Sequence, residues 1–136
     1  MFEEGLHDIC QAHGLSAVYL FGPPARTQAA GPADAQVGLV FRDSLGPEEI
    51  TGIHPKLLGA FRELLGAQAL NLIYLQQVGP LLQYQGILGR LIYSADPTRR
   101  ADFEDRVVRD YLDFAFEMRL FDEEFAEEMD RESGSG

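Results

Sequence analysis

Apolar residues along the chain follow two patterns, short continuous runs and three-to-four-residue spacing, which predict strands and helices respectively. The short runs predict four strands, at Leu15–Phe21, Val37–Phe41, Ala69–Leu75 and Gly89–Tyr93. The wider spacing and the Gly and Pro positions predict helices at Phe2–His13, Ala25–Ala30, Pro55–Gly66, Pro80–Leu88 and from Pro97 to about Glu132. The chain is therefore expected to form a sheet packed by helices.

Two features define the expected helices more closely. Gly52 and Pro55 interrupt the segment Glu48–Gly66, so the main helix is expected to begin at Pro55. Its apolar face should pack on the sheet and consists of Leu57, Leu58, Phe61, Leu64 and Leu65. Asp96, just before Pro97, is suited to cap the last helix.

The last helix carries an apolar seam that continues for about three heptads. The seam is formed by Val107, Tyr111, Phe114, Met118, Phe121, Phe125 and Met129. A second group widens the apolar surface in the first half: Val108, Leu112, Phe116 and Leu120. A narrow stripe of Phe and Met on an acidic helix suits docking to another helix or groove. The candidate partner-binding residues are Phe114, Met118, Phe121, Phe125 and Met129; alternatively, the whole helix folds back on its own domain.

Composition narrows the functional classes. The 136 residues suit one domain, expected at 1–132, with 133–136 as a flexible Gly/Ser tail. A net charge of −11 argues against a broad nucleic-acid surface, which needs clustered Lys and Arg. The single cysteine, Cys10, excludes an intrachain disulfide and suits a reducing cytoplasm. No apolar stretch is long enough for a membrane span, so a cytoplasmic location is expected.

The stretch Ala17–Phe41 carries a strand, a glycine loop, a small-residue segment with an acid, and a second strand. This layout resembles the nucleotidyltransferase superfamily of the polymerase-β type, and within it the minimal nucleotidyltransferases that are antitoxin partners of HEPN-domain proteins. Gly22, Ala25-Arg26 and Asp34 match that family's glycine, Ala-Arg and first metal-binding Asp. The fold class that the resemblance implies is α/β (α+β), a small mixed β-sheet packed by helices with a long C-terminal helix.

The same comparison exposes three departures at the catalytic positions. Pro23 stands where the family has a loop serine, Gln36 where it has the second Asp, and Asn71 where it has the third. Amide side chains offer neutral oxygens, but they neither supply charge to Mg²⁺ nor accept a proton. Rescue by other acids is disfavoured: strand alternation places Asp43 opposite Gln36, and Glu48-Glu49 fit a first helical turn. Asp34 remains a weak metal-ligand candidate, and Gly22 and Arg26 are remnants of a nucleotide site.

The interpretation is a catalytically degenerate nucleotidyltransferase-fold protein. The resemblance implies an antitoxin-like or regulatory role through a HEPN-type protein partner, with self-association through the last helix as an equal candidate. No cofactor is expected under this interpretation. Two alternatives stay open: an active Mg-dependent enzyme that transfers adenylate from ATP to a partner protein, and a nucleotide sensor without turnover.

Overall fold

A computed structural model describes residues 2–21, 34–66 and 69–134, except for the side chains of 34, 35, 69 and 124–134. Four strands form one sheet in the order β3-β2-β1-β4. The strands are β1 Leu15–Phe21, β2 Asp34–Phe41, β3 Ala69–Tyr74 and β4 Arg90–Ser94. The helices are α1 Phe2–His13, α2 Pro47–Leu65, α3 Pro80–Ile87 and α4 Pro97–Gly134, and a 3₁₀ turn, η2, spans Leu75–Gln77.

The sheet is mixed, as expected. β1 lies between β2 and β4 and is antiparallel to both, whereas β2 and β3 are parallel. The parallel pair needs a crossover, and α2 supplies it. Within the described segments, none of the helices combines the length and apolar character needed to cross a membrane.

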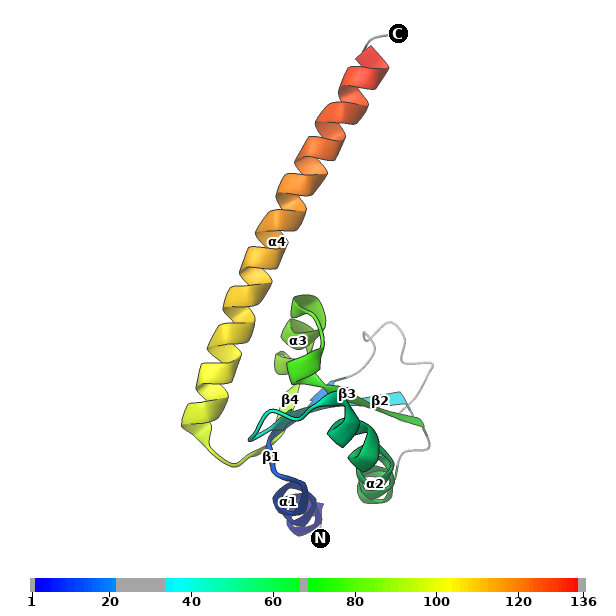
Figure 1. Cartoon of the computed structure of the whole chain (residues 1–136), viewed down its shortest axis with the longest axis vertical. Coiled ribbons are helices and arrows are strands. Elements are labelled where there is room, and N and C mark those ends of the chain that lie inside the picture. Colours follow the sequence, from blue (N-terminus) through cyan, green and yellow to red (C-terminus); the bar gives the residue numbers. More distant parts are fainter. Residues whose placement is uncertain (1, 22–33, 67–68, 135–136) are drawn as a thin grey trace.

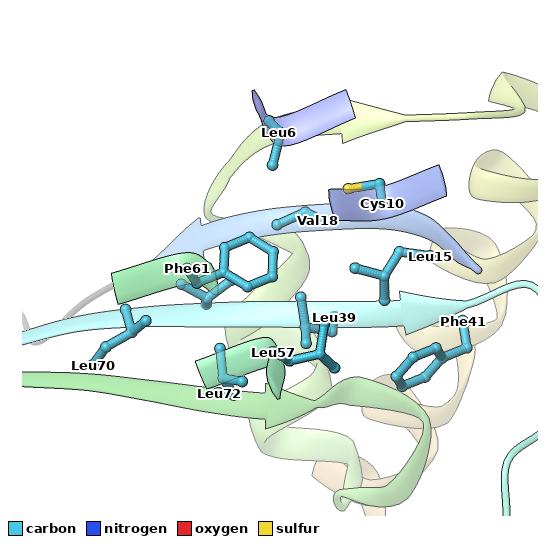
Figure 2. Close-up of a cluster of buried hydrophobic side chains, with 11 residues drawn as sticks. Leu6, Cys10, Leu15, Val18, Leu39, Phe41, Leu57, Phe61, Leu70 and Leu72 are labelled. Atoms are coloured by element: carbon cyan, nitrogen blue, oxygen red, sulfur yellow. The ribbon is translucent and has the colours of Figure 1, made fainter. Parts of the chain in front are cut away.

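The sheet separates two layers of helices (Figure 1), and each layer packs an apolar cluster against it. On one face α1 and α2 cover the larger cluster, in which Leu57 and Phe61 of α2 are fully buried. Figure 2 shows these side chains meeting the inward-facing residues of the strands, among them Val18 and Leu39. The predicted apolar face of α2 therefore packs on the sheet, because Leu58, Leu64 and Leu65 also contact this cluster.

The opposite face is covered by α3 and the first part of α4 (Figure 1). Its smaller buried cluster contains Tyr19 and Leu75. Two glycines make room for Leu75: a Cβ at Gly38 would lie 2.9 Å from its Cδ1, and one at Gly86 would lie 2.7 Å from its Cδ2. A Cβ at Gly89 would overlap the carbonyl oxygen of Leu20, so the α3–β4 turn requires glycine there.

The expected start of α2 is wrong. One continuous helix runs from Pro47 to Leu65 and includes Pro55 in its interior. Pro55 lacks an N–H, so the helix forgoes one backbone hydrogen bond at this turn. Ile53, which precedes it, packs against the large cluster together with Leu57, and this burial favours helix on both sides of the proline.

Other element boundaries differ by a few residues. β2 begins at Asp34 rather than Val37, because pairing with β3 continues through Asp34 and Ala69. β3 ends at Tyr74, and Leu75, which was expected in the strand, turns into η2. α4 continues to Gly134, so it includes the first two residues of the expected Gly/Ser tail. The short helix expected at Ala25–Ala30 lies outside the described residues.

Three contacts fix the first half of α4. Asp96 caps it as predicted, because its Oδ1 accepts hydrogen bonds from the backbone N–H groups of Thr98 and Arg99. The Tyr19 hydroxyl of β1 donates a 2.6 Å hydrogen bond to Oε1 of Glu104. Farther along, the rings of Tyr84 and Tyr111 stack 3.9 Å apart, which joins α3 to α4.

Candidate functional site

The two amide residues expected at the catalytic positions lie side by side. Gln36 of β2 and Asn71 of β3 are direct partners in the parallel register. Gln36 alternates with Val37 and Leu39, which enter the cluster covered by α1 and α2, so it belongs to the face covered by α3 and α4. Asn71 likewise alternates with Leu70 and Leu72. The fold therefore brings together the two positions that the sequence singled out.

The chemistry of this amide pair is neutral. Gln36 is half-buried and Asn71 is exposed, and neither side chain donates or accepts a hydrogen bond within the described residues. No group of three or more His, Cys, Asp or Glu side chains in the described part of the chain is placed to hold a metal ion. Mg²⁺ bound to a triphosphate is usually held by one or two carboxylates, so these two positions fit it poorly.

The remaining members of the predicted nucleotide site are only partly described. Asp34 occupies the first position of β2, opposite Ala69, two residues before Gln36. Gly22 and Arg26 lie outside the described residues. The alternative acids lie at the other end of β2: Asp43 follows its last residue by two positions and is exposed, and Glu48-Glu49 occupy the first turn of α2.

The first two predicted partner-binding residues, Phe114 and Met118, lie in a groove between α3 and α4. This groove has a volume of about 480 Å³. Leu81 of α3 lines one side, and Phe114 and Met118 of α4 line the other. The lining also includes Arg119, Asp122 and Glu123. The groove is therefore largely apolar, and its charged lining residues are two acids and one arginine.

The exposure of the seam changes along α4. Val107 is buried, with 1% of its surface exposed, whereas Met118 and Phe121 are 44% and 62% exposed. Phe125 and Met129 lie on the α4 backbone, but their side chains are outside the described set. The seam thus changes from core packing to an unpartnered surface between Val107 and Met118.

The second apolar group of α4 is exposed along its whole length. Val108, Leu112, Phe116 and Leu120 have between 38% and 59% of their surface exposed. Phe116 and Phe121 are five residues apart, which places them about 140° apart around the helix. The sequence alone does not distinguish this opposite face as a separate surface, because its spacing is also that of a wider seam.

Comparison with known proteins supports the fold. No protein-family model matches the chain, and no curated protein matches its sequence. Among solved structures, a chain of the toxin–antitoxin MntA–HepT superposes with a TM-score of 0.64 at 15% identity, covering 92% of this chain and 97% of that chain. A toxin–antitoxin with AMP-PNP gives a TM-score of 0.66 at 14% identity, covering 93% and 99%.

A third similar structure is described as a tri-AMPylated Shewanella oneidensis HEPN toxin in complex with MNT antitoxin. It matches with a TM-score of 0.64 at 15% identity over 92% of this chain and 96% of that chain. The similarity covers nearly the full length on both sides. At these identities the likeness concerns the fold: the chain has the nucleotidyltransferase-type fold of MNT antitoxins.

Proposed function

We propose that this protein is an antitoxin-like binding protein that acts on a HEPN-type partner by direct contact. The observation that carries the proposal is the apolar groove at Phe114 and Met118, together with exposed Phe121 one turn farther along the same helix. The similar structures are toxin–antitoxin assemblies, which supports a partner of this class.

The charges of α4 define the chemistry of the partner. Beyond Phe121, five Glu and two Asp are accompanied by Arg131 alone. Negative charge near a helix C-terminus opposes the helix dipole, and a helix with no packed face gains little stability in water. A partner surface with apolar anchors and a basic rim would neutralise the negative charge and would give the helix a packed face. The occupant of the groove is therefore expected to present such a surface.

The test is co-expression with a candidate HEPN-type protein, followed by purification through a tag on this chain. Phe121→Asp is expected to abolish co-purification, because a charge would be placed in the apolar contact. Phe116→Asp is the matched control, since it is the same residue type with similar exposure on the opposite face. Loss with Phe116→Asp alone, or with neither variant, would contradict the proposed surface.

Self-association through the same seam remains a second binding mode. Multi-angle light scattering of the chain alone distinguishes it from partner binding. A dimer that Phe121→Asp converts to a monomer would assign the seam to a second copy. A monomer that gains one partner chain on co-expression would assign it to the HEPN-type protein.

Loss of catalysis is the other part of the proposal, and the neutral pair of Gln36 and Asn71 supports it. Residual adenylate transfer is the competing function, favoured by the AMPylated toxin in a similar structure. Incubation of the complex with labelled ATP and Mg²⁺ is expected to leave the partner unlabelled. Labelling that disappears in Asp34→Ala would establish the transferase instead.

A further inference from the structure

A polar pocket lies at the end of β2, away from both the amide pair and the groove. It has a volume of about 320 Å³, within the usual range for small-molecule sites. Its walls come from the start of β1, the segment after β2 and the first three turns of α4.

The pocket concentrates positive charge in an acidic protein. Arg42, Arg99 and Arg106 line it, and Asp102 is the single acid among its lining residues. The chain as a whole has a net charge of −11. Within the described residues, the ion pair at 4 Å or less is that of Arg100 with Glu104, so no described carboxylate neutralises the three lining arginines at that distance. Such a cluster favours a bound anion.

The backbone that carries Arg42 is held rigidly. Its N–H donates to the carbonyl oxygen of Gly14 at 2.9 Å, and its own carbonyl accepts from Nη1 of Arg99 at 3.2 Å. The Gln76 side chain makes two hydrogen bonds to the backbone of the adjacent Phe41. Its Oε1 accepts from the Phe41 N–H at 2.8 Å, and its Nε2 donates to the Phe41 carbonyl oxygen at 3.1 Å. Gln77 Nε2 donates to the carbonyl of Leu45 at 3.0 Å.

These contacts fix the backbone at Arg42 and one nitrogen of Arg99, whereas the side chains of Arg42 and Arg106 are exposed and keep their donors free. Arg99 uses one of its five N–H groups on Arg42, and no other hydrogen bond or ion pair involves the three guanidinium groups within the described residues. Ser16 and Ser44 add hydroxyl groups to the walls. Guanidinium forks match the oxygens of phosphate in bidentate geometry, and several of them together favour a doubly charged oxyanion.

We propose that this pocket binds a small phosphate monoester. The pocket is separate from the amide pair because Gln36 and Asn71 are near the opposite end of β2, and from the groove because that begins at Tyr111. The site does not depend on the proposed function. A ligand there would contact β1, β2 and α4 together and would stabilise the attachment of α4 to the sheet.

The test is isothermal titration calorimetry of the full chain with inorganic phosphate, ribose 5-phosphate and AMP, in chloride of matched ionic strength. At least one of the two monoesters is expected to bind, and Arg42→Gln and Arg106→Gln should each weaken it by about tenfold or more. The matched control is Arg109→Gln, which removes the same charge from an exposed position on α4 outside the pocket.

The outcomes distinguish a specific anion-binding site from nonspecific electrostatic attraction. Binding of ribose 5-phosphate or AMP that survives Arg109→Gln and is lost in both pocket variants supports the site, whereas binding of inorganic phosphate without either monoester would overturn the proposal. Absence of binding at 10 mM probe, taken as roughly the weakest useful affinity, would overturn the proposal. Equal weakening by all three variants would also overturn it. Circular dichroism confirms that each variant is folded.

Discussion

The two halves of α4 have the same apolar spacing but different surroundings. In the first half Val107 is buried, Glu104 accepts a hydrogen bond from Tyr19, and Tyr111 stacks on Tyr84. In the second half Met118 and Phe121 are exposed. The same apolar spacing therefore forms core or exposed surface according to what the fold places beside it.

The strongest test places a charge in the packed half. Val107→Asp is expected to lower the free energy of unfolding by about 3–4 kcal/mol, because it buries an unpaired carboxyl group. Urea unfolding followed by circular dichroism measures this. Met118→Asp is the control in the exposed half. Equal losses in the two variants would show that the halves do not differ.

The second test removes the polar attachment of α4 to β1. Tyr19→Phe should lower the free energy of unfolding by about 1–2 kcal/mol, because it deletes a hydrogen bond to a charged carboxylate. Tyr93→Phe on β4 is the matched control, since its hydroxyl makes no hydrogen bond within the described residues. A loss no larger than that of the control would mean that the Tyr19–Glu104 contact does not secure the helix.

The third test uses alkaline pH. Burial, followed by the hydrogen bond to Glu104, raises the pKa of Tyr19 well above its ordinary value of 10.0. Above pH 10 the unfolded chain releases this proton while the folded chain retains it, so stability is complete below pH 10 and falls as pH rises. The slope contributed by Tyr19 approaches about 1.4 kcal/mol per pH unit. Denaturant titrations from pH 9 to 11 should show a shallower decline in Tyr19→Phe.

The smallest effect on the free energy of unfolding is expected in the exposed second half of α4. Phe121→Ser should change the free energy of unfolding of the isolated chain by less than about 0.5 kcal/mol, because its side chain is 62% exposed. Thermal and urea unfolding of the purified chain check this. A loss above about 1 kcal/mol would mean that Phe121 already packs on its own domain or on a second copy.

Local signals predicted much of the fold. The end of α1 was predicted by Gly14, which adopts the left-handed conformation with φ 68°, and the start of α4 by Asp96. The start of α2 was missed because Pro55 is a strong local breaker. Packing around Ile53 and Leu57 outweighed that signal, and tertiary burial is invisible to a local rule.

The candidate sites also differ in how far the sequence alone could predict them. The family resemblance associates Gln36 with Asn71 in advance, although the apolar pattern begins the strand only at Val37; the parallel register pairs the two residues. The arginine pocket could not, since Arg42 and Arg106 are far apart in sequence and only the loop geometry brings them together. The exposed opposite face of α4 was missed because spacing alone does not say which side of a helix meets the domain.

The length of α4 has a hydrodynamic consequence. Its 38 residues span roughly 57 Å, and Figure 1 shows that its distal end projects well beyond the sheet. Such a rod raises the frictional coefficient of a 15.1 kDa chain, so the free protein should sediment more slowly than a sphere of equal mass. Occupation of the rod by another chain would add mass with little added drag, which makes sedimentation velocity a direct reporter of assembly.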